Sequence, residues 1–326
     1  MTKEKSQIIR GIAILLMLAY HLHYISDSYV SLIYISEKPF TYYINNMANP
    51  VSFYIVLSGY GLSYIGQTSW DYKIRKILIL YITYWLTLIL FPILLGSIIR
   101  PDKYPSSFLE IFMNFTGYIT SYNKHNWFLF PYIVLFLLSG YIQTMVDRIG
   151  IIWSIVGSFL ASFLCTYLIS IYQHTIGHFM YTVLSTVGMT FTFVAGMIME
   201  RLNRNGKLRW NRITSPIAVF LILSLCFVRS LFHTHAINSI FAITIVYLLI
   251  HVNFPQCLKS VLFYLGKYSM PIWFIHGYFL IYLFHDYLIM LRYPLFIYLV
   301  VVLVSLAVAV PLNGLSIAMC KKLHLK

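Results

Sequence analysis

The chain has 326 residues, of which 60% are hydrophobic, 18% are aromatic and only 10% are charged. This composition excludes an ordinary soluble domain and is typical of a polytopic membrane protein. The formal net charge of +14 does not indicate a nucleic-acid partner, because most Lys and Arg residues fall in short stretches between apolar segments, where they orient a membrane protein.

Ten apolar segments of membrane-spanning length follow one another along the chain. They cover residues 8–25, 44–65, 77–99, 126–146, 151–171, 182–199, 213–231, 236–251, 263–283 and 295–317. The first is too long for the hydrophobic core of a cleavable signal peptide, so we expect it to remain as the first transmembrane helix. The sequence predicts an all-α polytopic membrane protein, a bundle of about ten transmembrane helices that forms a single domain over residues 1–326.

The distribution of Lys and Arg predicts the orientation of this bundle. With the N-terminus inside, fifteen of these residues lie on the cytoplasmic side and five on the outer side. The cytoplasmic set is Lys3, Lys5, Lys73, Arg75, Lys76, Arg148, Arg201, Arg204, Lys207, Arg209, Arg212, Lys259, Lys321, Lys322 and Lys326, and the outer set is Lys38, Arg100, Lys103, Lys124 and Arg292. An even number of spans also returns the basic C-terminus to the cytoplasm, so we expect both termini there.

Two connecting segments carry further predictions. Residues 100–125 hold apolar side chains at roughly helical spacing, which could form an amphipathic helix on the membrane or fold back into the bundle. The basic segment 200–212 is an orientation anchor or a contact for an anionic ligand. The four cysteines are scattered without metal-ligand spacing, and we expect no metal site.

Arg10 and His21 lie eleven residues apart in the first span. At about 100° per residue the two side chains share one helix face, about 16 Å apart along the axis. Ionisable groups are costly in such a segment and are therefore functional candidates. A neutral His21 can act as a general base for a hydroxyl nucleophile, and Arg10 can clamp a phosphate. The alternatives are a structural histidine and an arginine that reaches lipid phosphates.

Three further patterns follow in chain order. The second span contains Ser58-Gly59, a basic turn with Arg75 and Lys76 enters the third span, and Leu265-Gly-Lys-Tyr-Ser-Met-Pro-Ile-Trp-Phe-Ile-His276 lies near the C-terminus. Together with the Arg–His pair of the first span, these patterns resemble the acyltransferase-3 family of integral membrane O-acyltransferases. That family modifies bacterial surface polysaccharides, lipid-linked sugars and related acceptors.

The resemblance covers the whole chain, with the motifs in the family's order. The matching residues are Arg10 and His21, Ser58 and Gly59, Arg75 and Lys76, Trp127 and Leu129, and then Gly266, Ser269 and His276. Two departures concern polar groups of the family: Ile79 replaces a second frequent Arg, and Tyr132 stands at about the place of a frequent Glu. A carboxylate partner of His21 would therefore come from elsewhere, and Asp27 is the nearest in sequence.

The resemblance implies a membrane acyltransferase that moves a small acyl group, in the first place acetyl, from cytoplasmic acyl-CoA to a hydroxyl of a cell-envelope carbohydrate or lipid-linked saccharide. It implies CoA phosphate binding by Arg10, Arg75 and Lys76. His21, with Arg10, would carry the catalysis, either as a general base or as a transient acyl carrier. Trp127, Ser58 and His276 would bind substrate, although His276 could instead bond structurally within the bundle. The implied location is the bacterial cytoplasmic membrane, in contact with its lipids.

A different class of protein also fits the intramembrane charges. In a secondary transporter or flippase for a glycan or small anion, Arg10 and His21 would be substrate or proton sites. Turnover of a thioester would separate an acyltransferase from such a transporter.

Overall fold

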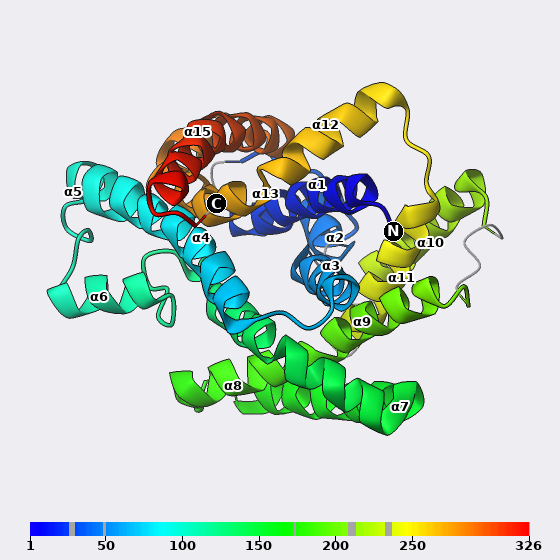
Figure 1. Ribbon diagram of the computed structural model, residues 1–326. Helices are drawn as coiled ribbons and strands as arrows, with labels where there is room; N and C mark the ends of the chain where they lie inside the picture. Colours follow the sequence, from blue (N-terminus) through cyan, green and yellow to red (C-terminus); the bar gives the residue numbers. More distant parts are fainter. Residues whose placement is uncertain (26–29, 48–49, 173, 208–212, 232–236, 326) are drawn as a thin grey trace.

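The computed structural model is an almost entirely helical molecule (Figure 1). It describes residues 1–326 except 26–29, 48–49, 173, 208–212, 232–236 and 326. Four residues of the sequence predictions lie outside the described residues, namely Asp27, Arg209, Arg212 and Lys326. In the described part of the chain the strands are confined to one antiparallel hairpin, in which β1 (Tyr34–Ile35) pairs with β2 (Lys38–Pro39) in the register Tyr34 to Pro39.

The first half of the chain forms α1 (Lys3–Tyr20), η1 (His21–Tyr24), α2 (Phe40–Met47), α3 (Pro50–Ile65), α4 (Trp70–Leu88), the π-helix η2 (Ile89–Leu95), α5 (Gly96–Ile99), α6 (Phe108–Thr116), η3 (Lys124–Asn126) and α7 (Leu129–Tyr172). The second half forms α8 (His178–Gly188), α9 (Thr190–Arg204), α10 (Ser215–Leu231), α11 (Asn238–His251), α12 (Gln256–Lys267), α13 (Ser269–Gly277), the π-helix η6 (Tyr278–Tyr282), α14 (His285–Ile289) and α15 (Pro294–Lys322).

Hydroxyl side chains begin several of these helices. The Thr2 hydroxyl accepts a hydrogen bond from the Lys5 amide, at 3.2 Å, at the start of α1. The Ser69 hydroxyl accepts one from the Tyr72 amide, at 3.3 Å, at the start of α4. Each bond satisfies an amide that has no partner within its own helix, so these residues determine where the apolar runs become helical.

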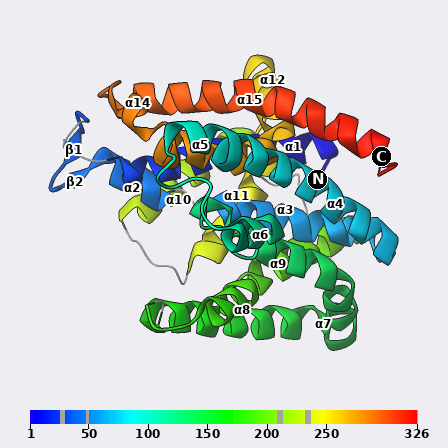
Figure 2. The ribbon, with the colours of Figure 1, turned by 90° about the vertical axis from the view of Figure 1, so that its left-hand side faces the viewer.

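Helix α7 contains a sharp change of direction at Gly150, which has a φ of 81° and a ψ of 167°. Glycine adopts this conformation without the steric cost that a Cβ would add. The bend divides α7 into two limbs that coincide with the predicted spans 126–146 and 151–171. Figures 1 and 2 show that α8 runs alongside the second limb in a layer at the edge of the molecule.

Helix α1 lies at the centre of the bundle, against α3, α12 and α13 (Figure 1). Its side chains Ile9, Ala13 and Ile14 are completely buried. Neighbouring helices contact α1 on several faces, and this explains how its stretch from Gly11 to Ala19 can be apolar on all sides yet well packed.

Two helix crossings are close enough to require glycine. A Cβ on Gly11 of α1 would lie 2.0 Å from the carbonyl oxygen of Leu262 in α12, and Gly266 of α12 meets α1 just as closely. In the same way, a Cβ on Gly59 of α3 would lie 2.0 Å from the carbonyl oxygen of Phe193 in α9. Small residues that let backbones approach are typical of helix contacts in membranes.

The loop that contains α6 forms a compact polar unit. The Ser106 and Ser121 hydroxyls both donate hydrogen bonds to the Glu110 carboxylate. These bonds hold the pKa of the Glu110 carboxyl below its usual value. The predicted helix within residues 100–125 is thus present as α6, and Phe108 and Phe112 on it are exposed.

Within the described residues, five helical stretches are long and apolar enough to cross a membrane: Lys3–His23, Trp70–Ile99, Lys124–Tyr172, His178–Arg204 and Pro294–Lys322. Two shorter apolar helices, Ser215–Leu231 and Asn238–His251, accompany them. These findings confirm an all-α multi-pass membrane protein. The number of ten spans and the cytoplasmic position of both termini stay predictions.

Candidate functional site

Three histidines from distant parts of the chain form a cluster at one end of α1. The ring centroid of His21 lies 4.0 Å from that of His125 and 5.1 Å from that of His276, while the rings of His125 and His276 are 5.9 Å apart. We call His21, His125 and His276 the histidine cluster. His21 is 9% exposed and His276 is fully buried, so little solvent reaches the two rings.

The loop before α7 brings His125 into the cluster by docking onto α13. The side-chain amides of Asn123 and Asn126 donate to the carbonyl oxygen of Phe274, at 3.0 and 3.5 Å. In return, the Trp273 indole N–H donates to the carbonyl oxygen of His125 at 3.1 Å. These three bonds fix the backbone of the loop against the helix that carries His276.

The hydrogen bonding of His276 determines its tautomer. Its Nδ1 lies 2.7 Å from the carbonyl oxygen of Trp273 and 3.3 Å from that of Ile272. A carbonyl only accepts, so Nδ1 carries the proton. Nε2 is buried with no hydrogen-bond partner among the described residues, and in the neutral ring it is the acceptor nitrogen.

Arg10 lies outside the histidine cluster and lines a cavity nearer the N-terminus of α1. This wide cavity has a volume of about 340 Å³ and is lined by the end of α3, the start of α4 and the first limb of α7. Its polar or charged lining residues include Arg10, Ser58 and Lys76. Two of the three predicted CoA phosphate ligands, Arg10 and Lys76, thus line the same cavity as Ser58, which was predicted to bind substrate.

A second, narrow cavity of about 140 Å³ continues from the wide one. The two share Arg10, Ser58, Leu80, Tyr132 and Met270 as lining residues. The narrow cavity adds Tyr54, Phe128, Ser269 and Trp273 and ends there. The residues that line the two cavities include no member of the histidine cluster.

The Ser58-Gly59 pair has a structural explanation. Gly59 faces α9 at the close crossing, whereas Ser58 on the adjoining face lines both cavities. The Tyr54 hydroxyl donates to the carbonyl oxygen of Arg10 at 3.3 Å and so joins α3 to α1. The glycine thus lets α3 pack tightly while the serine beside it remains available to a ligand.

Not every predicted site residue lies in these cavities. Arg75 is exposed and lines neither cavity, although its neighbour Lys76 lines the wide one. Trp127 is 38% exposed and also lines neither. The two residues that depart from the family pattern, Ile79 and Tyr132, both line the wide cavity.

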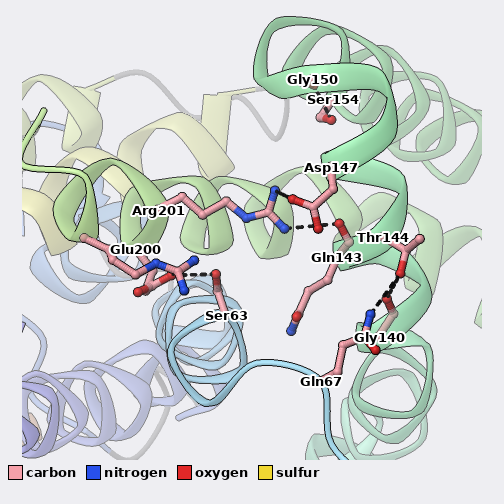
Figure 3. Close-up of polar contacts among 11 residues, drawn as sticks. Ser63, Gln67, Gly140, Gln143, Thr144, Asp147, Gly150, Ser154, Glu200 and Arg201 are labelled. Atoms are coloured by element: carbon pink, nitrogen blue, oxygen red, sulfur yellow. Dashed lines mark hydrogen bonds and ion pairs between the residues drawn. The ribbon is translucent and has the colours of Figure 1, made fainter.

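A polar network holds the cavity walls together at the ends of α3, α7 and α9 (Figure 3). Arg201 pairs with Asp147 at 2.7 Å and donates to the carbonyl oxygen of Gln143 at 3.1 Å. The Ser63 hydroxyl donates to the buried Glu200 carboxylate at 2.8 Å. Arg201 of the basic segment 200–212 therefore binds within the protein, as an anchor between helices.

His125 is the site residue that the sequence analysis missed. A signal was present, because His125 stands two residues before the motif residue Trp127 in a stretch rich in Asn and His. Its significance depended on contacts with α13, which lies far along the chain.

A family model described as an acyltransferase domain matches residues 5–314, nearly the whole chain. No curated protein and no solved structure matches the chain.

Proposed function

The chain belongs to the acyltransferase-3 family and is a multi-pass membrane protein. We propose that it transfers a small acyl group, namely acetyl, from acyl-CoA to a hydroxyl of a cell-envelope carbohydrate. The observation that carries the proposal is the pair of joined cavities. They run from Lys76 past Arg10 to Trp273, whose indole is bonded to the backbone of His125. A donor could therefore enter beside cationic groups and extend toward the histidine cluster.

The wide cavity suits the anionic part of the donor. Lys76 and Arg10 offer positive charge to phosphate groups, and Arg can bind phosphate through two parallel hydrogen bonds. Arg75 is exposed on the same turn and would add charge near the entrance without touching the cavity. The cavity lies at the turn between α3 and α4, which the Lys and Arg distribution assigns to the cytoplasm.

The histidine cluster suits the transfer itself. The acceptor hydroxyl oxygen attacks the carbonyl carbon of the thioester while His21 takes the hydroxyl proton. The new C–O bond forms, the C–S bond breaks, and His21 returns the proton to the departing thiolate, which leaves as free CoA thiol. The alternative is a transient acyl-histidine: His21 attacks the thioester carbonyl and the CoA thiolate leaves, and then the acceptor hydroxyl displaces His21 from the acyl group while its proton passes to the thiolate.

His125 and His276 support this role of His21. Their rings lie against the His21 ring, and His276 is held in place by its bonds to the backbone of α13. The cluster stands at the end of α1 opposite its N-terminus, which the orientation prediction places toward the outside. An acceptor would reach it from the membrane or the outer side of a bacterial cytoplasmic membrane.

A transfer assay tests the proposal. Membrane vesicles from cells that produce the protein receive acetyl-CoA labelled in the acetyl group, and label in the carbohydrate fraction and free CoA thiol are both measured. We expect His21→Ala to lose about 10²–10⁴-fold in transfer, the usual contribution of a general base. His174→Ala, which changes an exposed histidine outside the cluster, is the matched control and should retain transfer.

Two results would contradict the proposal. Wild-type transfer by the His21→Ala protein would remove His21 from the mechanism. If the wild-type protein moved a glycan across the vesicle membrane without releasing any thiol, the protein would be a transporter or flippase instead.

A further inference from the structure

The narrow cavity and the histidine cluster are separated by aromatic side chains. On α13, Ser269 and Trp273 line the narrow cavity, and His276 follows on the same helix face at the next turn. The cavity therefore ends at the Trp273 indole, one turn before His276. Trp273 is only 7% exposed and belongs to the core of the bundle.

The ring of Phe128 completes this barrier. Its centroid lies 5.5 Å from that of Trp273, so these two rings stand together at the end of the narrow cavity. Tyr132, whose ring centroid is 5.6 Å from that of Phe128, lines both cavities. The hydrogen bond from the Trp273 indole N–H to the carbonyl oxygen of His125 fixes the indole in this position. The barrier is thus attached directly to the loop that carries one of the histidines.

The volume in front of the barrier limits what can occupy it. A protein cavity of about 150 Å³ holds benzene, a molecule of six heavy atoms. The narrow cavity, at about 140 Å³, therefore holds a thioester with a short acyl chain but leaves no room for a long one. Its lining is mostly apolar, which suits an acyl group.

We propose that Trp273 determines the length of the acyl group that this protein transfers. The inference rests on the proposed function, because it assumes that the thioester occupies the narrow cavity. A short acyl group fits in front of the indole and leaves its carbonyl close to the barrier. A longer chain meets the indole and holds its carbonyl back from His21.

Chain-length profiles test this assignment. In the vesicle assay, the wild-type protein and Trp273→Ala each receive acetyl-, butyryl- and octanoyl-CoA, and kcat/KM is obtained for each donor from the release of free thiol. Two substrates that differ by one methylene group in an apolar pocket differ in kcat/KM by about 10–200-fold. We expect the wild-type protein to prefer acetyl-CoA, and the ratio of butyryl to acetyl turnover to rise at least about tenfold in Trp273→Ala.

Two further variants make the test specific. Trp273→Leu keeps an apolar side chain in the core while removing the ring, and it should shift the profile in the same direction even if the alanine variant fails to accumulate. Trp153→Ala removes an exposed tryptophan ring from the second limb of α7, away from both cavities, and should leave the ratio within about twofold of the wild-type value.

The outcomes separate the inference from the proposed function. An unchanged ratio in both Trp273 variants, with acetyl transfer still measurable, would overturn the role of Trp273 and leave the acyltransferase proposal standing. Equal use of acetyl- and butyryl-CoA by the wild-type protein would overturn it as well. If the wild-type protein released thiol from none of the three donors, the proposed function itself would fail.

Discussion

The close crossing of α3 and α9 offers a sharp test of how the cavity is built. Gly59 and Gly61 both lie within α3, two residues apart, and differ only in what surrounds them. A Cβ on Gly59 would lie 2.0 Å from the carbonyl oxygen of Phe193, whereas a Cβ on Gly61 would meet nothing within 4 Å. The same substitution should therefore have opposite effects at the two positions.

The expected magnitudes follow from this geometry. Ordinary carbon–oxygen contact needs well over 3 Å, so Gly59→Ala forces the two helices apart by more than about 1 Å. Overpacking of this kind costs about 1–3 kcal/mol, and the obstacle is backbone, which cannot rotate away. Gly61→Ala adds no clash and replaces glycine in a helix interior, which stabilises a helix by up to about 1 kcal/mol.

Thermal unfolding of the two purified variants in detergent, followed by tryptophan fluorescence, measures the difference. We expect the unfolding temperature to fall for Gly59→Ala and to stay the same or rise for Gly61→Ala. Because Ser58 is attached to the displaced stretch of α3, we also expect Gly59→Ala to weaken donor binding. Equal stability of the two variants would refute the view that backbone contact with α9 requires glycine at position 59.

Three further predictions concern the proposed donor site, the α6 loop and the orientation. Lys76→Ala should raise the KM for acyl-CoA about tenfold and Arg75→Ala should raise it much less, because of these two residues Lys76 alone lines the wide cavity. A larger effect of Arg75→Ala in initial-rate measurements would contradict this placement. The pKa of Glu110 is lower in the folded state than in the unfolded state. The ionised Glu110 therefore stabilises the α6 loop at pH values above its unfolded pKa of about 4.3, and this stabilisation is lost as the pH falls through the lower folded pKa. The protection of the α6 amides, measured as hydrogen exchange relative to the intrinsic rate at each pH, should therefore fall upon acidification below about pH 4 in the wild-type protein and change less in Glu110→Gln. An identical pH response of the two proteins would contradict the assignment. Finally, an impermeant thiol reagent should label Ser107→Cys but not Asn205→Cys in intact cells, and the opposite pattern would invert the topology.

The polar network of Figure 3 lies next to the helices that line the wide cavity. The network joins α3, α7 and α9 through the Arg201–Asp147 pair and the bond from Ser63 to Glu200. It therefore positions the helices that carry Ser58 and Tyr132. Separating α3 from α9 would leave the buried Glu200 carboxylate without its hydrogen bond from Ser63, which costs free energy. This cost opposes any movement of the two helices apart.

The sequence by itself determined the class of protein. Long apolar segments can satisfy their backbone hydrogen bonds in a membrane only as helices or closed barrels, and their length and composition favour helices. Helical periodicity placed Arg10 and His21 on one face of α1, and the order of short motifs was enough to indicate the family. These features are local, so they can be identified without knowing which helices touch.

Only the tertiary structure decided which groups meet. His125 and His276 join His21 because Asn123 and Asn126 bond to α13, a contact between segments that no local pattern connects. The exclusion of Arg75 from a cavity that its neighbour Lys76 lines depends on how the start of α4 packs. In a helix, adjacent side chains point about 100° apart, so a motif matched residue by residue cannot show which of two neighbours faces the ligand; the packing of the surrounding helices determines that.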